Sequence, residues 1–182
     1  KLLIISFTSF VLKYRLSRQP GQPYKFEEHV LADGQRAIRL VRHRAAEFHL
    51  DPEKIGMLGF SAGGEVVSIT CYKPGEGSPN AADPIDREFA KPNFQMLVYP
   101  GPVGIPSRLP NDTPPAFMVI AADDAHTSVL LNLMHQCSNR ERMECHQQWF
   151  LLLSQNRCTK GLQLRSRYQR HPSQMVHRLQ LL

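Results

Sequence analysis

The stretch from Lys54 to Tyr72, KIGMLGFSAGGEVVSITCY, joins a short apolar run to a Gly-x-Ser-x-Gly motif. Residues 54–60 have the length and composition of a buried strand, and residues 61–72 can continue as a helix. At the junction, Gly59 and Gly63 let the backbone make a tight, strained turn that presents the Ser61 hydroxyl above a sheet. The stretch therefore predicts a strand, a nucleophile elbow and a helix. The alternative is a glycine-rich turn with a bystander serine.

Further apolar runs flank this stretch. FTSFVLKYRL at 7–16, FQMLVY at 94–99 and AFMVIAA at 116–122 each predict a strand, and Pro-rich and Gly-rich loops at 73–92 and 100–115 separate the later ones. Strands that are apolar on both faces and alternate with helices or long crossovers indicate a parallel α/β sheet. Ligands of such sheets bind where the strands end.

Residues 27–48 predict an amphipathic helix. Its apolar or small positions recur every three or four residues, at Leu31, Gly34, Ile38, Val41, Ala45 and Phe48. Residues 1–12, KLLIISFTSFVL, predict a buried strand rather than a signal peptide, because no small-residue cleavage site follows them. The amino-terminus looks truncated, and the compartment stays undetermined.

Charge and composition change abruptly near residue 126. The chain has 182 residues and a net charge of +6, of which residues 1–126 contribute none (14 basic, 14 acidic) and residues 127–182 contribute all (8 basic, 2 acidic). Because the first part is neutral, it predicts no nucleic-acid binding. We expect residues 1–126 to form a partial α/β domain. Residues 127–182 are expected to be a divergent basic segment that is disordered or translated out of frame.

Two other kinds of site are considered in the carboxyl-terminal part. A basic patch could bind nucleic acid or an anionic surface, but aromatic residues are sparse in it and a solvated tail is the alternative; its members are Arg165, Arg167, Tyr168, Arg170, His171 and Arg178. A metal site is not predicted, because the spacing of Cys137, Cys145, His146 and Cys158 fits no common zinc motif. No stretch has the 18 or more apolar residues of a membrane span.

Acyl-transfer chemistry at Ser61 needs an acid further along the chain and a histidine after it. Asp124 follows the predicted strand 116–122, at the sheet edge where Ser61 also lies. Asp123 is its competitor, and the alternative is that both carboxylates only cap a loop or helix. The Ala62 amide, at a helix start, can donate to a developing oxyanion.

The motifs together resemble a known family. They are FVLKYRL at 10–16, GQRAIRLVRHRAAEFHLDPEKIGMLGFSAGG at 34–64, DPIDREFAKPNFQMLVYP at 83–100 and DTPPAFMVIAADD at 112–124. Residues 10–126 resemble the small bacterial α/β-hydrolase esterases related to acetyl-xylan and feruloyl esterases. The resemblance implies an acyl-enzyme on Ser61, Asp124 as the acid, and small-molecule or polysaccharide esters as substrates. It implies no cofactor and no metal. A serine peptidase of the same fold is an alternative.

The sequence departs from the family pattern in three places. Glu65 follows Gly64 where the family usually has histidine, and it places an extra carboxylate beside the nucleophile. The family's glycine-rich oxyanion loop lies upstream of the part that matches residues 7–16. The glycine-flanked catalytic histidine has no counterpart. His126 is expected to be too close to Asp124 to be oriented by it while reaching Ser61, and the later histidines are expected to be bystanders: His135, His146, His171 and His177. A catalytically inactive fragment or relative is therefore the alternative function.

Overall fold

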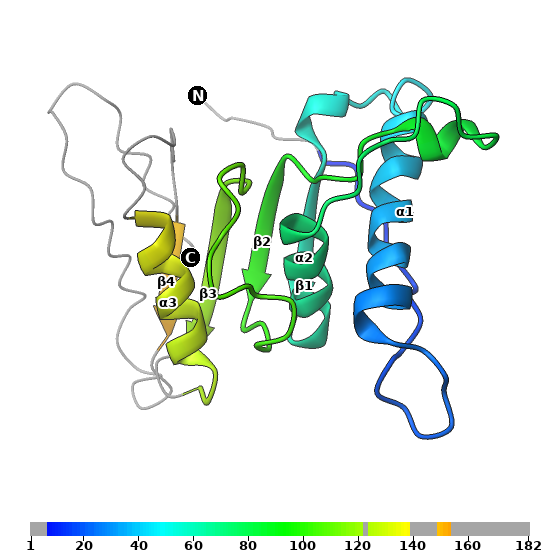
Figure 1. Ribbon diagram of the computed structural model, residues 1–182. Coiled ribbons are helices and arrows are strands. Elements are labelled where there is room, and N and C mark those ends of the chain that lie inside the picture. Colours follow the sequence, from blue (N-terminus) through cyan, green and yellow to red (C-terminus); the bar gives the residue numbers. More distant parts are fainter. Residues whose placement is uncertain (1–6, 122–123, 139–148, 154–182) are drawn as a thin grey trace, which may run out of the picture.

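A four-stranded parallel sheet forms the centre of the molecule. The computed structural model describes residues 7–121, 124–138 and 149–153. The strands are β1 (Gly56–Phe60), β2 (Phe94–Val98), β3 (Ala116–Ala121) and β4 (Trp149–Leu153), in the spatial order β1-β2-β3-β4. All neighbours are parallel, and Phe60 lies opposite Val98 where β1 and β2 end (Figure 1). The predicted parallel α/β sheet is confirmed.

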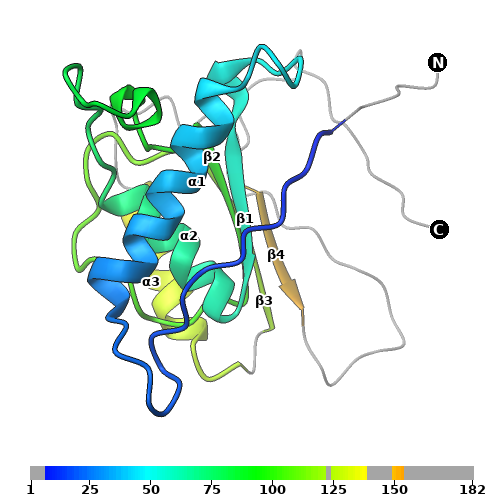
Figure 2. The same cartoon turned by 90° about the vertical axis from the view of Figure 1, so that its right-hand side faces the viewer.

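The three α-helices lie on the same side of this sheet (Figure 2). They are α1 (Leu31–His43), α2 (Ala62–Tyr72) and α3 (Thr127–Ser138), and a π-helical turn, Phe26–Val30, leads into α1. Short 3-10 turns occur at Pro52–Lys54 and Pro84–Arg87. Helix α2 packs on β1 and β2, α3 packs on β3, and α1 packs on α2. The predicted helix 27–48 is thus present, with its regular part ending at His43.

The core lies between the sheet and these helices. Leu97, Met118 and Ile120 are buried under α2 and α3, and Leu130 and Leu133 belong to the same cluster. On the opposite face of β1, Leu58 and Phe60 are 51% and 53% exposed. Within the described ranges, no helix covers that face.

Arginines of α1 fasten the long loop between α2 and β2. Arg36 forms ion pairs with Asp83 and Asp86, at 2.6 and 2.8 Å. One turn further on, Arg39 donates to the carbonyl oxygens of Glu76 and Glu88, both at 2.9 Å. Arg36 and Arg39 lie three positions apart on a helix, so they share one face. That face of α1 binds the loop between α2 and β2 through these contacts.

The strand expected at 7–16 is absent. Residues 7–16 run without regular secondary structure, and Val11 is fully exposed, so the buried strand predicted for residues 1–12 is also wrong for its described part. A strand needs a neighbour for its amide groups. Here the Arg15 amide donates instead to the Asp33 carboxylate at 2.8 Å, which holds this segment on α1. Residues 1–6 lie outside the described residues.

The segment after residue 126 contains regular structure that the composition did not predict. Helix α3 contributes Leu130 and Leu133 to the core, and β4 extends the sheet beside β3. The packed unit therefore continues past residue 126 in the described residues. The domain division itself stays a prediction, because residues 139–148 and 154–182 lie outside the described residues.

The described part of the chain contains neither a membrane-spanning helix nor a cluster of metal ligands. No helix in it is long and apolar enough to cross a membrane. No group of three or more metal-ligating side chains gathers there either.

The Arg15–Asp33 pair makes stability depend on pH. Burial would raise the pKa of Asp33, but hydrogen bonds from the Arg15 side chain and amide outweigh it and lower that pKa. The stabilisation is then present above the ordinary aspartate pKa of about 3.9 and is lost as pH falls through the lowered value.

We expect Asp33→Asn to reduce the free energy of unfolding at pH 7 by about 1 kcal/mol. The gap between wild type and variant should shrink when the pH is taken well below 4. Urea unfolding followed by far-UV circular dichroism at both pH values measures this difference in the free energy of unfolding. Glu28→Gln, which removes an exposed pair with Lys25, is the control with little effect. An equal gap at both pH values would contradict this role for Asp33.

Candidate active site

Ser61 lies in the turn that joins β1 to α2. Its backbone has φ 48° and ψ −119°, a region that non-glycine residues rarely occupy. The turn is held from both sides: the Ser61 amide donates to the Val98 carbonyl at 3.1 Å, and its carbonyl accepts from the Gly101 amide at 3.4 Å. The Ser61 residue is exposed. A strained serine presented at the carboxyl edge of a sheet has the geometry of a nucleophile elbow.

The glycines of the motif have different roles. A β-carbon added to Gly59 would lie 2.2 Å from the Gly63 carbonyl oxygen, and one added to Gly64 would lie 2.8 Å from the Pro100 side chain. A β-carbon on Gly63 would meet nothing within 4 Å. Close backbone approach therefore requires glycine at position 59. At position 64 an added methyl group would also be too close to its neighbour, Pro100. Nothing in the described structure requires glycine at position 63.

Ala62 is the first residue of α2 and is exposed. The first amides of a helix have no partner within the helix, and the helix dipole adds positive potential at that end. The Ala62 amide therefore has the position and electrostatics that an oxyanion donor beside Ser61 requires.

Asp124 follows β3, at the same edge of the sheet as Ser61. Its Oδ1 accepts from the His126 amide at 2.8 Å, which makes the turn before α3. The same oxygen lies 3.4 Å from Nδ1 of the His126 ring. Asp124 thus makes a local capping contact, and Asp123 lies outside the described residues. The His126 ring therefore meets the Asp124 carboxylate without reaching Ser61.

The described residues do not join Asp124 and His126 to the serine. Ser61 Oγ has no hydrogen-bond partner within the described ranges, and the His126 ring is beyond hydrogen-bond reach of it. The other candidates lie outside what is described: Asp123, the side chain of His135, and His146, His171 and His177. The same holds for the basic patch and for the side chains of Cys137, Cys145 and Cys158.

Glu65, one helical turn after Ser61, is 2% exposed and is held on both oxygens. Oε2 accepts from Arg18 Nη2 at 2.7 Å, and Oε1 accepts from the Val103 amide at 3.3 Å. The carboxylate that the sequence placed beside the nucleophile is therefore paired with a cation. The sequence offered no signal for Arg18, which lies 47 positions away.

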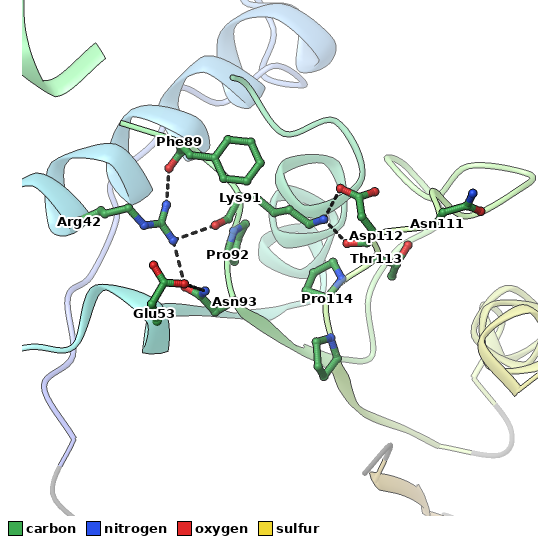
Figure 3. A pocket seen from close by; sticks show the side chains of 11 residues that line it. Arg42, Glu53, Phe89, Lys91, Pro92, Asn93, Asn111, Asp112, Thr113 and Pro114 are labelled. Carbon is green, nitrogen blue, oxygen red and sulfur yellow. Dashed lines mark hydrogen bonds and ion pairs between the residues drawn. The ribbon is translucent and has the colours of Figure 1, made fainter. Parts of the chain in front are cut away.

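Two hollows lie at different edges of the sheet. The larger, about 450 Å³, lies where β2 and β3 begin and is shown in Figure 3. Its two cations already have protein partners, since Arg42 donates to the backbone carbonyl oxygens of Phe89 and Lys91, and the Lys91 side chain pairs with Asp112. The smaller, about 160 Å³, adjoins the elbow, and its lining includes Arg18, Ala62 and Glu65. Of the two, only the smaller hollow is lined by residues next to Ser61.

Comparison with known proteins agrees with this geometry. The BD-FAE family model matches residues 1–96, which is more than half of the chain. The chain belongs to the BD-FAE family. It is an esterase-like α/β-hydrolase by family and fold, which confirms the resemblance read from the motifs.

A curated relative is the acetylxylan esterase of Xylanibacter ruminicola, 32% identical over 92 residues. That match covers 50% of this chain and 15% of the relative. Among solved structures, the acetyl ester-xyloside bifunctional hydrolase of Caldicellulosiruptor lactoaceticus is 28% identical, with a TM-score of 0.59 over 78% of this chain and 58% of that one. Esterase 2 of Thermogutta terrifontis, 22% identical with a TM-score of 0.55 over 78% of this chain and 57% of its own, shares the fold.

We expect Gly59→Ala to destabilise the BD-FAE chain by roughly 1–3 kcal/mol, because the added methyl overlaps the Gly63 carbonyl. Gly63→Ala is the matched control in the same motif, and its open surroundings predict unchanged or slightly higher stability. Thermal unfolding of both variants measures the difference. Equal midpoints would contradict the steric account of the turn.

Proposed function

We propose that this chain supplies the nucleophile, acid and part of the oxyanion site of a serine esterase. The observation that carries the proposal is the positive φ of Ser61 in a tight turn between β1 and α2. Such a turn is strained, and backbone strain of this kind clusters at functional sites. The next amide begins a helix, where it can donate a hydrogen bond to an oxyanion that forms at the serine. Family membership and the acetylxylan esterase relative support carboxylic esters as the substrate class.

The proposed reaction is an acyl transfer in two halves. Ser61 Oγ attacks the ester carbonyl carbon while a histidine oriented by Asp124 takes the hydroxyl proton. The carbonyl electron pair moves onto oxygen, where the Ala62 amide donates to the negative charge. Collapse of this intermediate breaks the bond to the alcohol, which leaves with the proton, and the acyl group stays on Ser61. Water then repeats the sequence and releases the acid.

For the substrate we propose acetyl or feruloyl esters of carbohydrates, on small molecules or polysaccharides. One named relative is an acetylxylan esterase and one solved structure is an acetyl ester-xyloside bifunctional hydrolase, which supports acetyl esters of carbohydrates. The chain spans 15% of that curated relative and 58% of that solved structure, so the activity of the whole protein is part of the proposal. A serine peptidase of the same fold would differ in cleaving amides.

The alternative is a catalytically inactive fragment or relative. One observation favours it, which is that Ser61 Oγ has no base within hydrogen-bond reach among the described residues. A serine without a base is a poor nucleophile.

We expect the purified chain to hydrolyse p-nitrophenyl acetate, and Ser61→Ala to reduce the rate to the uncatalysed background. Ser68→Ala is the matched control, because Ser68 lies on the same helix and is buried. Release of p-nitrophenolate measures both, and p-nitroanilide substrates separate amide cleavage from ester cleavage. A folded wild-type protein whose rate equals that of Ser61→Ala would support the inactive alternative.

The role of Asp124 can be separated from its capping contact. Asp124→Asn keeps an oxygen that can accept from the His126 amide but removes the charge that orients a histidine. We expect kcat to fall on the order of 10³-fold to 10⁴-fold with little change in unfolding midpoint. Asp123→Asn, in the competing position, should change kcat little. The reverse ranking of the two variants would assign the acid to Asp123.

A further inference from the structure

Arg18 and Glu65 both line the small hollow that adjoins the elbow. Glu65 belongs to the first turn of α2, and Arg18 belongs to the segment 14–19, which is far from it in sequence. The hollow of about 160 Å³ is lined by both, together with Ala62 and residues such as Tyr14 and Leu16. The ion pair therefore joins the two sides of the space next to the proposed oxyanion donor.

Glu65 also holds the loop that follows β2. Its Oε1 accepts from the Val103 amide, and a β-carbon on Gly101 would lie 2.1 Å from that oxygen. The Gly101 amide in turn donates to the Ser61 carbonyl at 3.4 Å. One buried carboxylate thus contacts the segment 14–19 and a loop that binds the backbone of Ser61.

The charge of this carboxylate has a consequence for catalysis. An unpaired negative charge near Ser61 would oppose the charge that develops on the carbonyl oxygen, and the low dielectric of a buried site would strengthen that effect. Arg18 supplies the opposite charge at 2.7 Å, and its guanidinium also lies 5.8 Å from the Phe26 ring centroid. The Phe26 contact is a second contact that restricts the guanidinium.

We propose that Arg18 and Glu65 are a positioning pair for the Ser61 elbow. The pair fixes segment 14–19 against α2 and cancels the charge of the buried carboxylate, so that the oxyanion forms in a neutral surrounding. Both residues act through the elbow rather than on the substrate. The inference rests on the proposed esterase function for its kinetic part and on the contacts alone for its structural part.

The kinetic test is a double-mutant cycle with p-nitrophenyl acetate. Arg18→Met leaves the Glu65 charge unpaired, and we expect kcat to fall on the order of tenfold while KM changes less than twofold. Adding Glu65→Gln to this variant removes the charge and should restore most of kcat. A purely structural role predicts instead that the double variant is at least as impaired as Arg18→Met.

Arg44→Met is the matched control. Arg44 also pairs with a glutamate, Glu47, and lies over an aromatic ring, Phe48. The set lies beyond α1, and Glu47 is exposed, whereas Glu65 is buried. Its kcat should equal that of wild type. An equal fall in Arg18→Met and Arg44→Met would overturn the proposal.

A second measurement does not depend on activity. Hydrogen exchange of the backbone amides in segments 14–19 and 101–104 should become faster in Glu65→Gln and stay unchanged in Glu47→Gln. If wild type shows no Ser61-dependent hydrolysis, the esterase proposal fails while the exchange result still tests the pair. Unchanged exchange in Glu65→Gln would overturn the positioning role, whatever the kinetics.

Discussion

The backbone of Ser61 is the constraint on which the described structure depends. A serine with φ 48° is tolerated only where its neighbours fix it, and here they do so from three directions. Gly59 lets the turn close, the Val98 carbonyl accepts from the Ser61 amide, and the loop after β2 donates to its carbonyl. The parallel pairing of β1 with β2 brings those last two contacts to one edge of the sheet.

The same edge brings the chemistry together. Strands β1 and β3 end there, so the turn with Ser61 and the turn with Asp124 face the same side, with the loop after β2 between them. Glu65 is a charged residue buried at this edge of the sheet. The carboxylate is buried beside the elbow, and a cation from a distant segment pairs with it. A buried charge without such a partner would be costly.

Local sequence patterns predicted the helices and strands around the elbow, but they did not predict contacts between residues far apart in the sequence. The glycine motif and the apolar runs gave β1, α2, β2 and β3 within a residue or two, because each pattern reflects its own backbone and burial. Segment 7–16 has strand composition, yet a strand also needs a neighbour, and the Arg15 amide binds Asp33 instead. The Arg18–Glu65 pair joins residues 47 positions apart, and no helical or strand periodicity relates residues at that distance. The Asp124 carboxylate lies 3.4 Å from Nδ1 of His126, a contact that brings no histidine to Ser61 among the described residues.

The central claim is that Ser61 is an activated nucleophile, and covalent labelling tests it most directly. The chain is treated with a fluorophosphonate and digested with trypsin, and the peptide of residues 55–87 is sequenced by mass spectrometry, because trypsin does not cleave between Lys73 and Pro74. The account predicts one phosphonyl group on Ser61 and none on Ser68, which is buried in the same peptide. A folded chain that stays unlabelled at Ser61, or that is labelled equally after heat unfolding, would contradict it.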